Sequence, residues 1–457
     1  MRERTLLSRL PTVVFVLFIG LWLQACATAP SGVLLPTAAV PEGADTVNVL
    51  VYSTRAESDQ PGVVYSGKRA ETLTSMAVEV SIPPDHEIGA VEWPRRRDRD
   101  PSRYFATVSI EPVLDDASAA AWISSHQTNG HLLVFVHGFN VPFDRAVYSL
   151  AQLTHDSGVQ AAPILFTWPS LGRVWGYVYD RESANYSRDA LERLLRVAAQ
   201  NPDVREITVM AHSMGSWIAV EALRQYAIRE GRVDPKIQNV ILAAPDLDVD
   251  VFAQQFNTLG EERPHFTFLV SRDDQALRMS RLIAGGVQRV GALDPSAEPI
   301  RSVLEQIGGI TIVNLTHVHG RDRLNHSVFS ESPEVVQLLG GSLMSGPGLS
   351  GSSDLPFGAI VLDVAETLTS DLSQKSPATG RAARHSRGAT ATRPGSSVAV
   401  GPAASNAQPA ASGAVVITLP PSDATDEAEP APEPEASAPS ASSAPVTPAE
   451  KDAVPHG

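Results

Sequence analysis

Residues 206–228 read EITVMAHSMGSWIAVEALRQYAI, and they join an apolar run rich in β-branched residues to a run with helical spacing through Ser213. The pattern G-x-S-x-G places a serine on a sharp turn between a strand and a helix, where small neighbours let the backbone pass. Here Ala211 stands at the first glycine position and Gly215 keeps the second. A tight turn with a buried or capping serine is the alternative interpretation. Because a strand and a helix flank the motif, we predict that Ser213 is a nucleophile.

Similar apolar runs alternate with helical stretches on both sides of this segment. Helices are expected, for example, over 144–153, 188–199 and 216–228. Short runs without internal charge are typical of parallel strands that helices cover on both faces. We therefore predict an α/β fold with a mostly parallel sheet over residues 116–342. The expected strands are LLVFVHG, APILFTW, EITVMAH, NVILAAP, FTFLVS and ITIVNLT.

The segments on either side of this domain have a different composition. Residues 46–115 alternate runs such as VNVLVYS and MAVEVSIP with Gly and Pro, which predicts a strand-rich N-terminal extension. Residues 343–457 are rich in Ala, Pro and Ser, and we expect a disordered tail because such a segment buries little apolar surface. Two apolar islands interrupt it, FGAIVLDV and GAVVITLP, which either dock on the domain or have no fixed place.

The N-terminus has the pattern of an export signal. A basic start precedes an apolar run over 13–23 and the sequence Leu-Gln-Ala-Cys, which ends at the single cysteine, Cys26. This resembles a bacterial lipoprotein signal, so residues 1–25 would be removed, Cys26 acylated, and residues 26–45 would form a linker. An ordinary secretory signal cut near Cys26 is the alternative. Ala27 after the cysteine favours the outer membrane, facing the periplasm, by analogy with such lipoproteins.

The charge balance argues against a nucleic-acid partner. The formal net charge is −15, and phosphate binding needs concentrated Lys and Arg. The one basic run, over 95–99, is interleaved with Asp98 and Asp100 and is interpreted as a solvated loop. We expect neither a cofactor nor a metal. His317, His319, Asp322 and His326 superficially resemble a metallohydrolase cluster, but their spacing is H-x-H-x-x-D rather than H-x-H-x-D-H.

A serine hydroxyl needs a base and an orienting carboxylate, in the chain order Ser, Asp or Glu, His. We choose His326 as the base over His317 and His319, because it follows a loop long enough to return over the sheet. Asp274, after the run FTFLVS, is the first choice for the acid. The alternative acids are Asp246 and Asp273, which a capping or loop-bracing role would also explain.

Two backbone amides must also face the oxygen that becomes negative in the tetrahedral intermediate. One candidate is the amide of Met214, directly after the serine. The other is the amide of Phe139 in the run His-Gly-Phe-Asn over 137–140, where Gly138 permits a close approach. His137 is interpreted as a group that braces this loop.

The chain also resembles a bacterial family of α/β-hydrolases of unknown function, which are esterase- or lipase-like. The resemblance covers about residues 47–340, and it implies an α/β-hydrolase fold with Ser213, Asp274 and His326 at the triad positions. It brings no substrate with it. Its marks are STRA, VSIPPDHEIGAVEWP, FVHGFN, FTWPS, YDRESANYS, AHSMGS, LAAPDLD, SRDDQAL and NHSVF.

The expected function is that of a serine carboxylester hydrolase that acts on a small acyl ester through an acyl-enzyme, at the bacterial envelope. A non-catalytic scaffold with this fold, or an acyltransferase with the same triad, are the alternatives. The segment before the 188–199 helix carries Trp175, Tyr177, Tyr179 and Tyr186. These aromatic residues either wall an acyl pocket, as a cap would, or pack a helix on the sheet.

Overall fold

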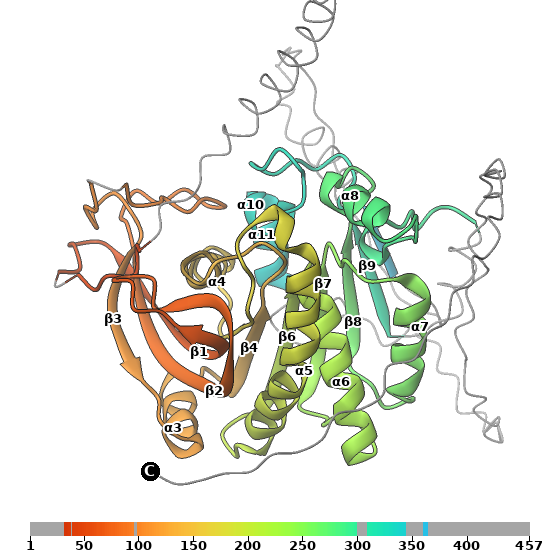
Figure 1. Ribbon diagram of the computed structural model, residues 1–457, viewed down its shortest axis with the longest axis horizontal. Helices are drawn as coiled ribbons and strands as arrows, with labels where there is room; N and C mark the ends of the chain where they lie inside the picture. The colour runs from red at the N-terminus through yellow and green to blue at the C-terminus, as the bar shows by residue number, and fades with distance from the viewer. Residues whose placement is uncertain (1–31, 38, 96–97, 299–308, 344–359, 364–457) are drawn as a thin grey trace, which may run out of the picture. The chain divides into compact units, whose positions relative to one another are not determined.

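A computed structural model describes residues 32–37, 39–95, 98–298, 309–343 and 360–363. The predicted signal peptide, Cys26 and most of the tail lie outside these residues. The described part contains one sheet of ten strands (Figure 1), and all six predicted parallel strands are present in it. The strands are β1 Asp45–Glu57, β2 Tyr65–Ile82, β3 Ala106–Pro112, β4 His131–Val136, β5 Ala162–Thr167, β6 Glu206–His212, β7 Ile237–Ala243, β8 His265–Val270, β9 Ile310–Asn314 and β10 Ile360–Asp363.

The spatial order of the strands is β10-β9-β8-β7-β6-β4-β5-β1-β2-β3. From β10 to β1 all neighbours are parallel, and β1, β2 and β3 form an antiparallel end. The N-terminal strands therefore extend the same sheet. Parallel strands end at one edge, so the segments that follow β4, β6 and β8 meet there, which is where such folds place ligands.

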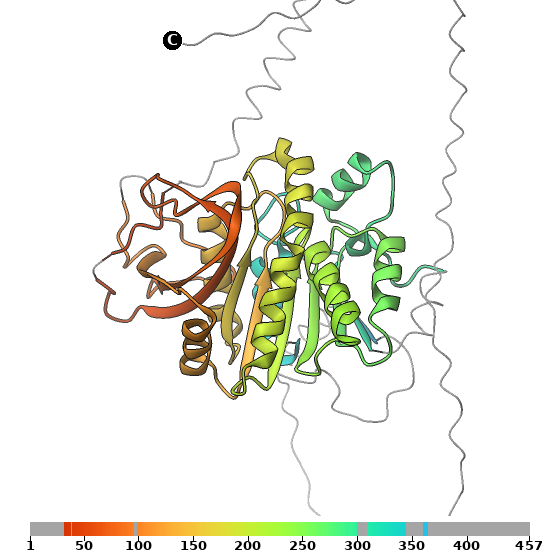
Figure 2. The same ribbon diagram turned by 60° about the horizontal axis from the view of Figure 1, so that its bottom comes forward.

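Helices cover both faces of the sheet (Figures 1 and 2). Helices α5, α6 and α7 pack on one face, and α4, α10 and α11 pack on the other. This confirms the predicted α/β fold. The helices are α3 Asp116–His126, α4 Phe143–Ser157, α5 Tyr177–Gln200, α6 Gly215–Glu230, α7 Val249–Thr258, α8 Gln275–Ile283, α10 Val328–Glu331 and α11 Pro333–Leu338, with short helical turns η2 Val174–Gly176, η3 Val290–Ala292 and η4 Leu339–Leu343.

The core explains why the strand sequences are mostly apolar. In β4, Leu132 and Val134 join the apolar cluster under α5 and α6, whereas Leu133 and Phe135 join the cluster under α4. Successive side chains of a strand point to opposite faces. Because both faces are covered, apolar side chains fill both faces of the strand from Leu132 to Val136.

Helix α5 begins at Tyr177, well before the expected start at residue 188. Its first turns bury Asp180, Ser183 and Ser187 against the molecule, with the small Ala184 as the apolar side chain among them. Thr54 and Ser187 share a hydrogen bond of 2.8 Å, and Arg69 donates to Ser183 at 3.0 Å. A helix whose buried face is polar has no hydrophobic period, so the pattern could not reveal its first half.

The first apolar island of the tail also departs from the expectation of disorder. Residues Ile360–Asp363 form β10, which pairs in parallel with β9 from Thr311 to Asn314. Without it β9 would be an edge strand with unpaired backbone groups, and a β-rich segment can satisfy them. The second island lies outside the described residues. Within the described part of the chain, no helix combines the length and apolarity that crossing a membrane needs.

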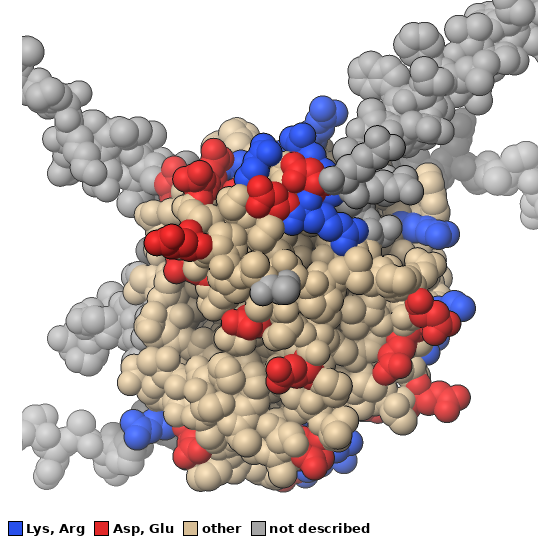
Figure 3. All heavy atoms as spheres, turned by 90° about the vertical axis from the view of Figure 1, so that its left-hand side faces the viewer, with Lys and Arg blue, Asp and Glu red and all other residues tan. Residues whose placement is uncertain are grey.

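The charged loop after β2 has mixed pairing. Arg95 and Asp98 form a backbone bridge, and Arg103 lies 3.5 Å from the Asp98 carboxylate. Figure 3 views the molecule from the side of the antiparallel strands, and basic side chains near its top lie among acidic ones. No extended basic surface is visible on this face.

Candidate active site

Ser213 lies on the turn between β6 and α6, at the carboxyl edge of the sheet. Its φ of 53° is in the left-handed region that residues other than glycine rarely adopt. Its N–H donates to the Ala243 carbonyl on the neighbouring strand at 2.9 Å. A Cβ at Gly215 would lie 2.4 Å from the His137 carbonyl, so only glycine allows this turn to pass over β4. This is the strained strand-to-helix geometry that the motif predicted.

The other glycine position of the motif tolerates alanine. Ala211 is fully buried within β6, where it pairs with Val136 of β4 and Leu242 of β7. The tight approach falls instead on Gly138, where a Cβ would lie 2.9 Å from the Ser213 Cβ. The loop after β4 thus passes so close to Ser213 that Gly138 has no room for a side chain.

Asp274 and His326 lie in direct contact. The Nδ1–H of His326 donates to Asp274 Oδ2 at 2.6 Å, and Asp274 is only 1% exposed. Asp274 also caps α8, because its Oδ1 accepts from the Leu277 N–H at 2.9 Å. Burial disfavours the charged form of His326, but the hydrogen bond and the charge of Asp274 outweigh this and raise the pKa of His326. The buried carboxylate therefore orients the imidazole and stabilises its protonated form.

His212 places His326 beside the serine turn. The two imidazole rings lie 4.7 Å apart, and the His212 Nε2–H donates to the His326 carbonyl at 3.3 Å. Burial holds the pKa of His212 well below its usual value, so this ring adds no charge to the site. Within the described residues, the Ser213 hydroxyl and the His326 Nε2 have no hydrogen-bond partner and remain available to each other or to a ligand.

The loop that carries His326 is fixed by Asp322. Its carboxylate accepts the backbone N–H groups of His326 at 3.0 Å and of Ser327 at 2.8 Å. Its own N–H donates to Glu331 in α10 at 2.6 Å. Asp322 thus braces the loop through backbone bonds. His317, His319, Asp322 and His326 do not gather at metal-binding distance among the described residues.

The alternative acids have other partners. Asp246 is buried and accepts from the Ser280 hydroxyl at 2.5 Å and from the Tyr177 hydroxyl at 3.1 Å. The Nε of buried Arg289 lies 3.2 Å from the same carboxylate. Asp273 accepts from the His317 N–H at 3.0 Å and lies 3.3 Å from its ring. Neither carboxylate contacts His326.

The Phe139 and Met214 amides face no protein acceptor. Among the hydrogen bonds of the described residues, neither N–H donates to any group, although their neighbours do. The Asn140 N–H donates to Asp180 at 3.3 Å, and the Val141 N–H donates to the Ser170 hydroxyl at 3.1 Å. These two amides, one directly after Ser213 and the other directly after Gly138, which approaches the serine closely, are suited to a developing negative oxygen.

Arg55, which the sequence did not single out, holds this loop in place. It is 1% exposed and donates to the Thr167 hydroxyl at 2.8 Å, the Val141 carbonyl at 2.7 Å and His137 Nε2 at 3.1 Å. Burial lowers its pKa to about 9, against the opposing effect of Asp180 and Asp144. The run STRA was its only signal, because an arginine in an apolar strand needs a buried role.

The aromatic residues before and within α5 have separate roles. Tyr179 donates to the Gly67 carbonyl of β2 at 3.1 Å and stacks with Arg69, so it fastens α5 to the sheet. Trp175, in contrast, is 82% exposed. Tyr177 lies between these two, and its ring is 5.3 Å from that of Phe139. Tyr186 donates to the Ala70 carbonyl of β2, so of these four aromatic residues Tyr177 is the one that contacts the loop beside the serine turn within the described structure.

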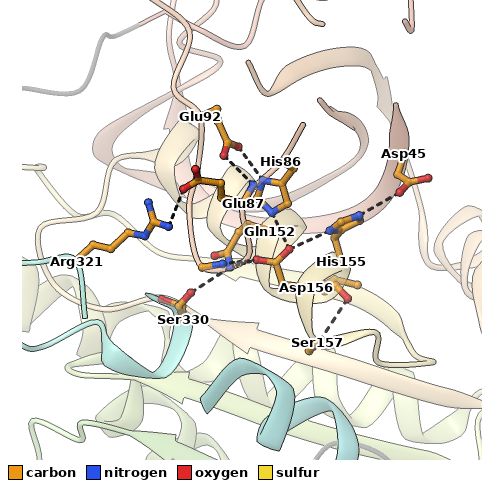
Figure 4. Close-up of polar contacts among 12 residues, drawn as sticks. Asp45, His86, Glu87, Glu92, Gln152, His155, Asp156, Ser157, Arg321 and Ser330 are labelled. Atoms are coloured by element: carbon orange, nitrogen blue, oxygen red, sulfur yellow. Dashed lines mark hydrogen bonds and ion pairs between the residues drawn. The ribbon is translucent and has the colours of Figure 1, made fainter. Parts of the chain in front are cut away.

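A buried ionic network joins the loop after β2 to α4 and α10 (Figure 4). His86 donates from both ring nitrogens, to Glu92 and to Asp156, at 2.7 Å each. Asp156, at the end of α4, also accepts from Gln152 at 2.7 Å, and Gln152 donates to the Ser330 carbonyl of α10 at 3.1 Å. The network therefore ties the loop after β2 to the helix that follows His326.

Comparison with known proteins agrees with this architecture. Residues 115–342 match the model of a family described as alpha/beta hydrolase of unknown function (DUF900). This part of the chain belongs to that hydrolase family. The hydrolase domain includes the serine turn, both free amides and the Asp274–His326 pair, whereas Arg55 and His86 come from strands and loops before it.

Other proteins match parts of this chain. An uncharacterized protein of Nostoc sp. is 31% identical over 121 residues, which is 21% of this chain and 31% of that relative. The chain thus matches less than a third of the length of that relative. Among solved structures, an esterase of Pyrobaculum calidifontis has a TM-score of 0.27 at 12% identity, with 59% of this chain and 81% of that chain covered. The brefeldin A esterase, a bacterial homologue of human hormone sensitive lipase, has a TM-score of 0.25 at 14% identity, with 80% and 84% covered.

Proposed function

We propose that this chain is a serine hydrolase that cleaves carboxylic esters through an acyl-enzyme. The observation that supports it best is the 2.6 Å bond between Asp274 and His326 beside the strained turn of Ser213. A serine on such a turn, a histidine held by a buried carboxylate and two free amides are the parts that acyl transfer needs.

The proposed first half-reaction uses each part once. Ser213 Oγ attacks the ester carbonyl carbon while its proton passes to His326 Nε2. Asp274 stabilises the imidazolium, and the amides of Phe139 and Met214 donate to the oxyanion. The tetrahedral intermediate then collapses: the bond to the alcohol oxygen breaks, and His326 returns the proton to the departing alcohol. The acyl group remains on Ser213.

Water completes the reaction by the same route. His326 takes a proton from water, the hydroxide adds to the acyl carbon, and the bond to Ser213 Oγ breaks as the serine regains its proton. We place this activity at the bacterial envelope, on the sequence pattern at Cys26, and retain an acyl acceptor other than water as the alternative that product analysis with added alcohols separates.

Active-site labelling tests the proposal directly. A fluorophosphonate probe should label the wild-type protein, and Ser213→Ala should abolish the label. Ser216→Ala is the matched control, because this buried serine directly follows the motif and its hydroxyl donates to the Ala211 carbonyl at 3.3 Å. An unlabelled wild-type protein that is folded by circular dichroism would refute the hydrolase proposal and favour a non-catalytic scaffold.

A further inference from the structure

Two segments beside the serine turn expose large apolar side chains. Val174 and Trp175 lie in η2 and Val178 in the first turn of α5, and Met279, Leu282 and Ile283 lie on α8. Their exposed fractions range from 55% to 82%. We call these six residues the apolar rim. Single exposed apolar residues are ordinary on a soluble protein, but a group of six from two adjoining segments marks an interaction surface.

The two halves of the apolar rim meet next to the candidate active site. The Tyr177 hydroxyl lies 3.1 Å from the Ser280 hydroxyl, which joins the start of α5 to α8. Tyr177 and Ser280 also share Asp246, whose N–H donates to the Ser213 carbonyl at 3.2 Å. Figure 1 shows α8 and the start of α5 at the same upper edge of the sheet. The apolar rim therefore borders the place where an ester must approach Ser213.

The charged side chains within the two segments of the apolar rim are all positive. Residues 171–178 and 275–288 contain Arg173, Arg278 and Arg281 but neither Asp nor Glu, in a chain with a formal net charge of −15. All three arginines are exposed. Exposed cations among the apolar residues of these two segments are complementary to an anionic, apolar partner.

A small cavity beside α8 supports the same chemistry. It has a volume of about 190 Å³, and four arginines line it: Arg272, Arg278, Arg281 and Arg289. Arg289 is 2% exposed, and its Nη2 has no hydrogen-bond partner within the described part of the chain. A buried guanidinium nitrogen without a partner is costly, and an anionic oxygen would satisfy it.

We propose that the apolar rim inserts into an anionic lipid surface and that the ester cleaved at Ser213 is a lipid taken from that surface. The cavity of four arginines would receive its negatively charged headgroup. This inference rests on the proposed hydrolase function for its substrate, but not for its binding surface. If each rim arginine gains about fivefold in partitioning near anionic lipid, the three together favour anionic over neutral vesicles on the order of a hundredfold at low salt.

Insertion of Trp175 is the direct test, and it needs no activity. The full chain is mixed with phosphatidylglycerol vesicles that carry brominated acyl chains, and the fluorescence of wild-type protein is compared with that of Trp175→Phe. We expect the anionic vesicles to quench the fluorescence of wild-type protein more than that of Trp175→Phe, and brominated phosphatidylcholine vesicles to quench it little. Absence of quenching from Trp175 on anionic vesicles overturns the proposal, as does a Trp175 emission that is already that of a buried residue before lipid is added, which would place another segment or a second copy on the rim.

Activity on two substrates separates this inference from the hydrolase proposal. The triple variant Trp175→Ser, Leu282→Ser, Ile283→Ser should lose roughly tenfold or more of its activity on an ester in anionic vesicles and keep its activity on soluble p-nitrophenyl butyrate. Leu114→Ser with Ile228→Ser is the matched control, because Leu114 is 86% and Ile228 58% exposed. Leu114 lies just before α3 and Ile228 near the end of α6, and Figure 1 shows α3 and the end of α6 at the edge of the molecule opposite to α8. Equal activity of the triple variant and wild type on the vesicle ester overturns the proposed lipid-binding surface. If wild type cleaves neither the vesicle ester nor p-nitrophenyl butyrate, the hydrolase proposal alone is refuted.

Discussion

Replacing Asp274 by asparagine isolates the charge of the candidate acid. Asparagine has nearly the same shape and caps helices as well as aspartate does, so the bond to the Leu277 N–H and the start of α8 should survive. What disappears is the negative charge that receives the His326 Nδ1–H at 2.6 Å. The variant therefore probes catalysis with little effect on the fold.

The magnitude follows from the burial of this pair. Asp274 is 1% exposed, and removing one partner of a buried ion pair costs about 3 to 5 kcal/mol. The imidazolium forms only as the reaction proceeds, so most of this cost should fall on the transition state. At about 1.4 kcal/mol for each tenfold change in rate, kcat should fall by roughly 10² to 10⁴.

The pH dependence has a definite sign. His326 must be neutral to accept the serine proton, so activity rises with pH through its pKa. Asp274 raises that pKa, and its loss should move the acid limb of the profile to lower pH while the plateau falls. The assay is hydrolysis of p-nitrophenyl butyrate from pH 5 to 9. A kcat within threefold of wild type, or an acid limb that moves to higher pH, would contradict the assignment.

The alternative acids supply the controls. Asp246→Asn leaves buried Arg289 without its charged partner and should lower the thermal midpoint, with a loss of about 3 kcal/mol of stability. Asp273→Asn changes a partly exposed pair and should leave both stability and kcat near wild type. If Asp246→Asn were to reduce kcat more than Asp274→Asn at unchanged stability, the carboxylate roles would have to be exchanged.

Three further predictions concern the supporting structure. Burial disfavours charged His86, but Asp156 and Glu92 raise its pKa to about 9. The stability that this shift contributes is fully present below pH 6.5 and is lost as pH rises through 9, and it amounts to at most about 3 kcal/mol before partial solvation reduces it. The free energy of urea unfolding should therefore differ more between pH 6 and pH 9.5 for wild type than for His86→Gln. Arg55→Met should lower kcat about a hundredfold with a smaller change in KM, because the loop that carries the Phe139 amide loses its hydrogen bond from Arg55 to the Val141 carbonyl. Arg55→Lys should recover part of the loss. A change in thermal midpoint without a change in kcat would assign Arg55 to stability only. Gly215→Ala should destabilise the fold by roughly 3 kcal/mol or more, because its Cβ meets the His137 carbonyl, and a soluble variant with a wild-type thermal midpoint would disprove that contact.

The sequence predicted the parts of the fold in which residue pattern and burial coincide. The six parallel strands are mostly apolar because helices cover both faces, and periodicity detects such runs. It failed where burial is polar. The first half of α5 buries Asp180 and Ser183, and Arg55 lies within an apolar strand, so neither has a hydrophobic signature. These exceptions form one connected region that supports the loop after β4.

Long-range polar contacts account for the other omissions. His86 and Asp156 lie in a loop and at a helix end far apart in the chain, and each alone is an unremarkable polar residue. Their role follows from a side-chain contact that the spacing of residues in the sequence does not predict. The strand β10 is a related case, because its four residues are ordered only through the edge that β9 offers them.

The choice between carboxylates shows where sequence reasoning reaches its limit in the site. Asp246 and Asp274 both follow a strand of the parallel sheet, so topology brings both to the same edge. What separates them is the cation that each one meets. Arg289 returns to that edge after α8 and pairs with Asp246, and the hydroxyls of Tyr177 and Ser280 occupy its remaining lone pairs. Asp274 keeps one oxygen for the start of α8 and has the other free for His326. The carboxylate that holds the base is therefore the one that the rest of the fold has not already neutralised.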